Sequence, residues 1–146
     1  MRGLEVAAVD RSPLTITALE DNDPRAISVN VAGPAALLVA KAYKINDRLQ
    51  RQEERPDRLS NKDAADVYRI MIKISAPAAS AVFDEALTDD RVGEVAAMGL
   101  EYLRQQSGGA ETPGVRMAVD ALAGDVDEMR VRTIMPAYVG RLAAAR

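Results

Sequence analysis

The sequence predicts an α+β fold in which a small antiparallel three-stranded sheet is followed by a helical bundle, best treated as one domain. In residues 1–33, short apolar stretches alternate with period two, as half-buried strands do. From residue 34 onward, apolar residues recur at helical spacing. Aromatic residues are scarce, with one Phe, four Tyr and no Trp, so the core must be built from small and aliphatic side chains, which suits closely packed helices.

Three segments of the first third are predicted to be strands. Residues 4–9 are short and apolar, Ser12-Pro13 is interpreted as a turn, and residues 14–19 alternate apolar and hydroxyl side chains, which together predict a hairpin. A polar loop over residues 20–25 leads to a third strand at residues 26–31. Such a small sheet cannot cover itself, so helices are expected on one face and a partner along one edge.

Helices are predicted over the remaining chain. Residues 34–75 are predicted to form a central helical hairpin, with one helix from Pro34 to about Gln52 and a second that uses Ser60 as its N-cap. Residues 76–146 are predicted to form a C-terminal helical region. Its first helix is expected at 76–87, and a second is expected to begin after a cap at Asp89 or Asp90. Two more are expected at 113–123 and at 126–144, the last with a kink at Pro136.

Two charged residues fall where apolar side chains are expected in the central hairpin. At 100° per residue, Lys41 lies between Leu37 and Ile45 in one apolar stripe, and Asp63 projects within the stripe of the next helix. Unpaired charges in an apolar seam cost several kcal/mol, roughly, so each needs a partner. One interpretation is a Lys41–Asp63 ion pair that fixes the helix register; the other is that Lys41 faces a cleft for an anion such as phosphate. Asp66 lies close enough on the same helix to reach that cleft.

The charge distribution is uneven along the chain. The net charge is −3, which is not typical of a protein that coats nucleic acid, so charge gives no support to an RNA acceptor. Nine of the 19 basic residues nevertheless fall between Lys41 and Lys73. A solvated surface and a phosphate-facing patch both explain this run.

The chain contains no cysteine and no histidine, which excludes disulfides, thiolate zinc sites and a histidine general base. No secretory signal follows Met1 and no run of about 18 apolar residues occurs, so a cytoplasmic location without membrane association is expected. Because Met1 leads almost directly into a predicted strand, the chain is expected to begin inside a larger ancestral domain.

A short pattern in the central segment resembles a known family. Lys41 is followed seven residues later by Arg48, and the next helix opens with the motif Lys62-Asp63-Ala64-Ala65-Asp66. Over residues 4–74 this resembles the latter half of the abortive-infection nucleotidyltransferase toxins of the AbiEii/AbiGii type. Beyond residue 74 only a helical region is shared.

The resemblance implies a DNA-polymerase-β-like fold that transfers a nucleotide from a nucleoside triphosphate to RNA or protein with Mg²⁺, within a toxin–antitoxin system. It implies that Lys41, Asp63 and Asp66 are catalytic or support the active-site helix. It also implies that the nucleotide-binding residues are cationic, namely Lys41, Lys44, Arg48 and Lys62.

The family's metal-binding signature, a Gly-Ser turn followed by two closely spaced aspartates on a strand, is not found in this sequence, where Asp21 and Asp23 fall in a loop. Asp10 corresponds at most to a third, metal-binding carboxylate, and it is also an ordinary turn former before Ser12-Pro13.

Three hypotheses follow from this departure. The chain is a truncated or degenerate nucleotidyltransferase that binds nucleotide without catalysing alone. Alternatively, it is an interaction module that pairs with a complementing chain, an antitoxin or a second copy. In the third hypothesis, it is an enzyme whose unorthodox site uses Asp10, Asp63 and Asp66 with Lys41.

Overall fold

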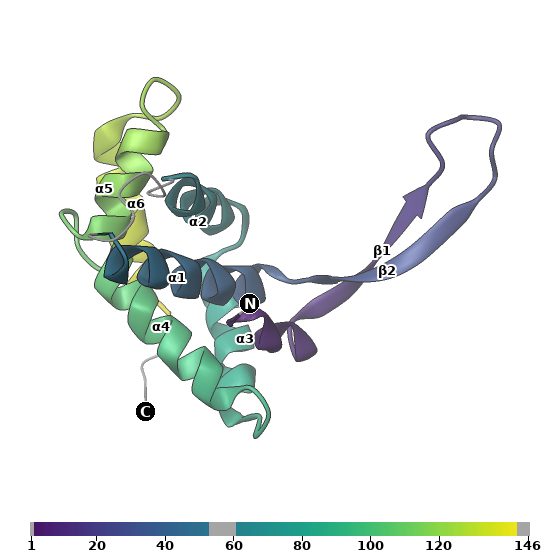
Figure 1. Cartoon of the computed structure of the whole chain (residues 1–146), viewed down its shortest axis with the longest axis horizontal. Coiled ribbons are helices and arrows are strands. Elements are labelled where there is room, and N and C mark those ends of the chain that lie inside the picture. Colours follow the sequence, from purple (N-terminus) through teal and green to yellow (C-terminus); the bar gives the residue numbers. More distant parts are fainter. Residues whose placement is uncertain (1, 53–60, 143–146) are drawn as a thin grey trace.

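The computed structural model describes residues 2–52 and 61–142, and in this part the α+β fold is confirmed. The described residues form a two-stranded antiparallel sheet, a short 3₁₀ helix and six α-helices. The two strands project as an arm from a body of packed helices (Figure 1). In chain order the elements are η1 (Leu4–Ala8), β1 (Arg11–Thr17), β2 (Ala26–Ala32), α1 (Pro34–Gln50), α2 (Lys62–Lys73), α3 (Ala76–Thr88), α4 (Gly93–Ser107), α5 (Pro113–Ala121) and α6 (Glu128–Val139).

The prediction of a strand at residues 4–9 is wrong, because Leu4–Ala8 forms the 3₁₀ helix η1. Gly3 begins this turn with a φ of 97°, a left-handed conformation that favours glycine. The side chain of Glu5 accepts a hydrogen bond from the Gly3 amide at 2.6 Å, and the carbonyl of Val6 accepts from Asp10 at 2.9 Å. The turn places Val6 in the core against α1, where it is completely buried. Burial of this one side chain overrides the strand propensity of the segment.

The predicted turn at Ser12-Pro13 is also wrong, since both residues lie within β1. β1 pairs along its whole length with β2, so that Leu14 lies opposite Val29. Pro13 lacks an amide donor, but β1 has only one neighbouring strand, and proline is tolerated in such an edge strand. The hairpin therefore joins the second and third predicted strands through the loop that follows Thr17.

The expectation that helices cover one face of the sheet is wrong as well. Every residue of β1 is exposed, and in β2 only Val29 and Ala32 are half-buried. The arm leaves the body at the junction between β2 and α1, and its far end lies away from all the helices (Figure 1). The sheet therefore contributes almost nothing to the core.

The helical body is organised around α1, which packs against η1, α2, α3 and α4. Gly99 of α4 permits a close approach, because an added Cβ would lie 2.6 Å from a methyl group of Val39 on α1. The fully buried side chains of largest volume come from several helices and include Leu38, Tyr68, Phe83, Leu100, Leu103 and Met135. Buried apolar residues of η1 and of α1 to α6 form one continuous cluster.

The observed helix ends differ from the predicted ones by a few residues. Asn61 precedes α2 as its N-cap, and the predicted cap Ser60 lies outside the described residues. The side chain of Asp89 caps a turn before α4, by accepting from the Arg91 amide at 2.8 Å, while α4 begins at Gly93. α6 contains Pro136, as expected, but ends at Val139; residues 143–144 of the predicted helix are not described. None of the described helices combines the length and the apolar character needed to cross a membrane.

Candidate functional site: the seam between α1 and α2 and its surroundings

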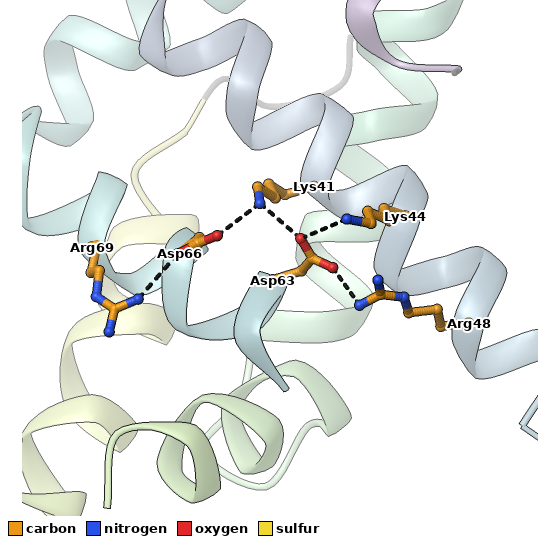
Figure 2. A network of polar contacts seen from close by, with 6 residues as sticks. All are labelled: Lys41, Lys44, Arg48, Asp63, Asp66 and Arg69. Atoms are coloured by element: carbon orange, nitrogen blue, oxygen red, sulfur yellow. Dashed lines mark hydrogen bonds and ion pairs between the residues drawn. The ribbon is translucent and has the colours of Figure 1, made fainter. Parts of the chain in front are cut away.

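The charged residues singled out in the sequence meet at the seam between α1 and α2 (Figure 2). Lys41, Lys44 and Arg48 share one face of α1, because positions three, four and seven residues apart are neighbours on a helix. Asp63 and Asp66 lie three residues apart in the first half of α2 and face these cations. The two helices therefore bring together charges that are 15 to 25 residues apart in the chain.

Asp63 is the centre of this network. Its Oδ1 atom accepts from Lys41 Nζ at 2.7 Å and from Lys44 Nζ at 3.2 Å, and its Oδ2 atom accepts from Arg48. Lys41 Nζ also donates to Asp66 Oδ2 at 2.8 Å. The predicted ion pair between Lys41 and Asp63 is thus confirmed, as is the expectation that Asp66 reaches the same place.

Arg69 completes the network from α2. Its guanidinium nitrogen lies 3.1 Å from Asp66 Oδ1, so both oxygens of each carboxylate are engaged by cations. The six side chains shown in Figure 2 carry four positive and two negative charges. Among these six side chains, positive charges therefore outnumber negative charges by two.

Burial and charge act in opposite directions on the pKa values of these groups. Burial alone raises the pKa of Asp63, whose side chain is only 4% exposed, but its hydrogen bonds to Lys41 and Lys44 outweigh burial and lower it. Asp66 follows the same pattern through Lys41 and Arg69. Burial lowers the pKa of Lys41, yet the two carboxylates reverse this and raise it. All three groups are therefore charged at neutral pH.

A groove of about 400 Å³ opens beside this network, at the base of the arm. Its apolar lining comes from Ala32, Pro34, Leu37 and Ile70, and its charged lining from Lys41, Asp66, Arg69 and Lys73. Three cations and one carboxylate give the groove an excess of two positive charges. Arg69 and Lys73 belong to the basic run between Lys41 and Lys73, but they are not among the predicted site residues, because their position beside the arm depends on tertiary structure.

The other predicted nucleotide-binding residues lie outside this groove. Lys44 instead lines a second pocket of about 390 Å³, together with Arg2, Asp47 and two tyrosines. Arg48 points along the seam toward Asp63 (Figure 2). Lys62, the first residue of α2, is exposed and takes part in none of the ion pairs between described residues.

Asp10, the predicted metal-binding carboxylate, lies beside the first turn of α1. Its Oδ2 atom accepts a hydrogen bond from the Ala36 amide at 2.8 Å, and its carbonyl accepts from the Gly33 amide at 2.8 Å. A carboxylate at this place satisfies an amide of the first helical turn and interacts favourably with the helix dipole. An added Cβ at Gly33 would overlap the Asp10 carboxylate. Asp10 thus caps α1 from outside the helix.

The predicted convergence of Asp10, Asp63 and Asp66 is not observed. Asp10 is held at the start of α1 by the Ala36 amide, whereas Asp63 and Asp66 are held by Lys41 in the seam between α1 and α2. In this same part of the chain no group of three or more acidic side chains is arranged to hold a metal ion.

The arm carries a second candidate surface. In an antiparallel pair, residues opposite each other point to the same face, and alternate residues share that face. The register therefore gathers five aliphatic side chains on one face, contributed by Leu14, Ile16, Ile27, Val29 and Val31. Four of these are between 36% and 61% exposed, whereas the opposite face carries mainly Thr, Ser, Asn and Ala. We call the first of these surfaces the apolar arm face.

Comparison of this chain with known protein families, with curated proteins and with solved structures finds no match in any of the three.

Proposed function

We propose that this chain is a nucleotidyltransferase-like protein that binds the phosphates of a nucleotide in the groove between α1 and α2 and does not catalyse by itself. The observation that carries the proposal is the groove's excess of two positive charges beside an apolar floor. Charge-assisted hydrogen bonds from Arg and Lys are the strongest protein contacts to phosphate. The resemblance of Lys41 and the Lys62–Asp66 motif to nucleotidyltransferase toxins points to the same class of ligand.

The lining of the groove suits the two chemical parts of a nucleotide. A base or ribose ring has an apolar surface that fits against Pro34, Leu37 and Ile70. Arg69 and Lys73 line the groove mainly with their apolar stems, and their charged ends would meet phosphate oxygens at its rim. A volume of about 400 Å³ lies within the usual range for small-molecule sites.

The state of the carboxylates supports the part of the proposal that concerns catalysis. Both oxygens of Asp63 and of Asp66 accept hydrogen bonds from cations, so Mg²⁺ at either aspartate would have to compete with the positive charges already held there. These residues therefore do not fit a metal held by the protein, and any Mg²⁺ in the groove would arrive on the nucleotide. A two-metal nucleotidyl transfer needs carboxylates that this cluster does not supply.

Calorimetric titration with ATP, CTP, GTP and UTP in magnesium tests the proposal. Binding to the wild-type chain should weaken at least tenfold in Arg69→Ala and Lys73→Ala, whose side chains line the groove. Arg130→Ala removes an exposed cation from α6 and serves as the matched control. Lys41→Ala should also weaken binding, but it removes a partner of the buried Asp63, so its fold is checked by circular dichroism. Failure of all four nucleotides to bind would overturn the proposal.

A second function is favoured by the apolar arm face, namely that of a module that associates with another polypeptide. Aliphatic side chains gathered on an uncovered sheet face are typical of interaction surfaces. An antitoxin, a complementing chain and a second copy are the partner classes that the sequence suggests. Binding of a hydrophobic dye tests this function, because an open apolar arm face should bind the dye and Leu14→Glu combined with Ile27→Glu should abolish that binding; equal dye binding by both chains would contradict it.

A further inference from the structure

We propose that the second pocket, which lies between the start of the chain, α1 and α4, binds a planar aromatic carboxylate. The pocket has a volume of about 390 Å³ and shares no lining residue with the groove proposed for nucleotide. Its lining comes from Arg2, Tyr43, Lys44, Asn46, Asp47, Gln50 and Tyr102. The inference goes beyond the proposed function, because it concerns a different site and a different class of ligand.

Two tyrosine rings line this pocket and stand at a right angle to each other. The ring centres of Tyr43 on α1 and Tyr102 on α4 are 5.1 Å apart, and the angle between the ring planes is 86°. A third ring can stack on one tyrosine while it presents its edge to the other, and these are the two arrangements that aromatic pairs prefer. The pair therefore favours a planar aromatic ligand over an aliphatic one of the same size.

The Tyr43 ring is held in place without a ligand. Its hydroxyl donates to the Val95 carbonyl at 3.4 Å, so α4 fixes the far end of the ring. Gly3 lies against the ring, because an added Cβ there would come within 3.0 Å of a Tyr43 ring carbon. A side chain that is already ordered loses little conformational entropy when a ligand binds.

Arg2 supplies the positive charge for a ligand in this pocket. Lys44 also lines it, but its Nζ atom lies 3.2 Å from Asp63 in the seam. The carboxylate of Asp47 is likewise paired, with Arg51 at 3.3 Å. Arg2 takes part in none of the ion pairs between described residues. Because a guanidinium matches the two oxygens of a carboxylate, this cation suits a ligand with one negative charge.

The charge of Arg2 acts at the tyrosine pair. Burial raises the pKa of the Tyr43 hydroxyl and the neighbouring Tyr102 adds to the rise, whereas the positive charge of Arg2 opposes it. Glu5 also acts on Tyr43, but its carboxylate accepts from the Gly3 amide at 2.6 Å and is not part of the pocket lining. A ligand that stacks on the tyrosines therefore has a guanidinium within reach of its carboxylate.

The remaining polar groups suit the edge of a heteroaromatic ring. Asn46 and Gln50 each carry an amide that both donates and accepts hydrogen bonds, and neither amide is bonded to another described residue. Asp47 repels a second negative charge in the pocket. A phosphate ester, with a charge of about −1.5 to −2 at pH 7, therefore fits less well than a carboxylate.

Indole-3-acetate is the probe that tests this inference, because it joins a heteroaromatic ring to a single carboxylate. The chain contains no Trp, so indole fluorescence reports the ligand alone. The wild-type chain should bind this probe about tenfold more tightly than indole-3-acetamide, which lacks the charge. Cyclohexaneacetate, which lacks the aromatic ring, should displace the probe poorly. Equal affinities for all three compounds would contradict the assigned ligand class.

Variants of the lining separate charge from stacking. Arg2→Ala should weaken binding of indole-3-acetate about tenfold and leave that of indole-3-acetamide unchanged, since only the first has a charge to lose. Tyr102→Leu should weaken the binding of both, with its fold checked by circular dichroism. Arg11→Ala, which removes an exposed cation from β1, is the matched control and should bind both as the wild-type chain does. Equal weakening of both probes by Arg2→Ala would show that Arg2 does not contact the carboxylate.

Nuclear magnetic resonance locates the probe. The ring signals of Tyr43 and Tyr102 should shift on binding, whereas those of the buried Tyr68 and Tyr138 should not. Arg69→Ala combined with Lys73→Ala, which alters the nucleotide groove, should leave binding of the probe unchanged. Loss of binding in this variant, or a wild-type chain that binds no indole-3-acetate at millimolar concentration, would overturn the inference.

Discussion

Lys41 of α1 and Asp63 of α2 are joined across an apolar seam, with Nζ and Oδ1 separated by 2.7 Å. Each group would be strongly destabilising there alone, because a charge removed from water needs compensation. Together with Lys44 and Arg48 they connect the two helices by charge-assisted hydrogen bonds. The stability of the contact between α1 and α2 therefore depends more on the carboxylate of Asp63 than on any one of its cationic partners.

Replacing Asp63 should destabilise the chain more than replacing Asp66, the other carboxylate of the seam. Asp63→Ala leaves three cations without their shared acceptor, and removing one partner of a buried pair typically costs about 3 kcal/mol. Asp66→Ala should cost about 1 kcal/mol, because its side chain is 25% exposed and water screens its pairs. Urea denaturation monitored by circular dichroism measures both.

Asp47→Ala is the matched control for these two variants. Asp47 pairs with Arg51 at 3.3 Å on the exposed surface of α1, where an ion pair contributes about 0.5 kcal/mol or less. Equal losses for Asp63→Ala and Asp47→Ala would show that the seam network does not hold α1 and α2 together.

The same network predicts how stability depends on acidity. The pKa values of Asp63 and Asp66 are lowered from 3.8 in the folded chain, so folding favours their charged forms. Their contribution is fully present above pH 3.8 and is lost as pH falls through the lowered folded values. Denaturation midpoints measured from pH 7 down to pH 2 should therefore fall more steeply for the wild-type chain than for Asp63→Asn. Parallel curves would contradict this linkage.

The contact between Lys41 and Asp63 was predictable from sequence because helical periodicity is local. A lysine and an aspartate within apolar stripes of consecutive helices leave few arrangements other than a mutual pair. The groove was not predictable in the same way, since Arg69 and Lys73 acquire their position from the base of the arm. Helical spacing alone says nothing about which distant segment lies beside a given face.

The errors in the sheet have a related physical origin. Period-two alternation identifies a strand but does not identify its partner, so Leu14 was assigned to a hairpin with the wrong segment. The segment around Val6 became a 3₁₀ helix because burial against α1 outweighs local preference. Alternation also implies one covered face, yet most of the apolar arm face is exposed and no described helix covers it.

Asp10 should stabilise the chain by capping α1, and this contribution should not require a metal ion. Asp10→Ala removes the acceptor of the Ala36 amide and should cost about 1 kcal/mol, whereas Asp10→Asn keeps an acceptor and should lose less. Gly33→Ala should destabilise the wild-type chain, since its Cβ overlaps the carboxylate, but should add little in the Asp10→Ala background. Melting temperatures of the wild-type chain and of these variants are measured by thermal denaturation with and without magnesium. A melting temperature that rises with magnesium only when Asp10 is present would support a metal role and contradict the capping role.

Tyr138 of α6 offers a change that should stabilise the protein. Its hydroxyl is buried and finds no hydrogen-bond partner among the described residues. A buried hydroxyl without a partner costs about 1 kcal/mol or more, so Tyr138→Phe should raise the free energy of unfolding by about 1 kcal/mol at pH 7. Tyr102→Phe, in a half-buried ring that contacts Tyr43 edge to face, is the matched control and should change stability little.

Alkaline pH should enlarge the difference between Tyr138→Phe and the wild-type chain. Burial raises the pKa of Tyr138 from 10.0 to about 12, so folding favours the neutral phenol. Its contribution is fully present below pH 10 and is lost as pH rises toward 12, because only the unfolded chain then releases the proton readily. Phenylalanine has no proton to release, so the variant escapes this loss. Urea denaturation at pH 7 and pH 11 measures the difference, and an equal gain at both values would show that the phenol is not buried in the folded chain.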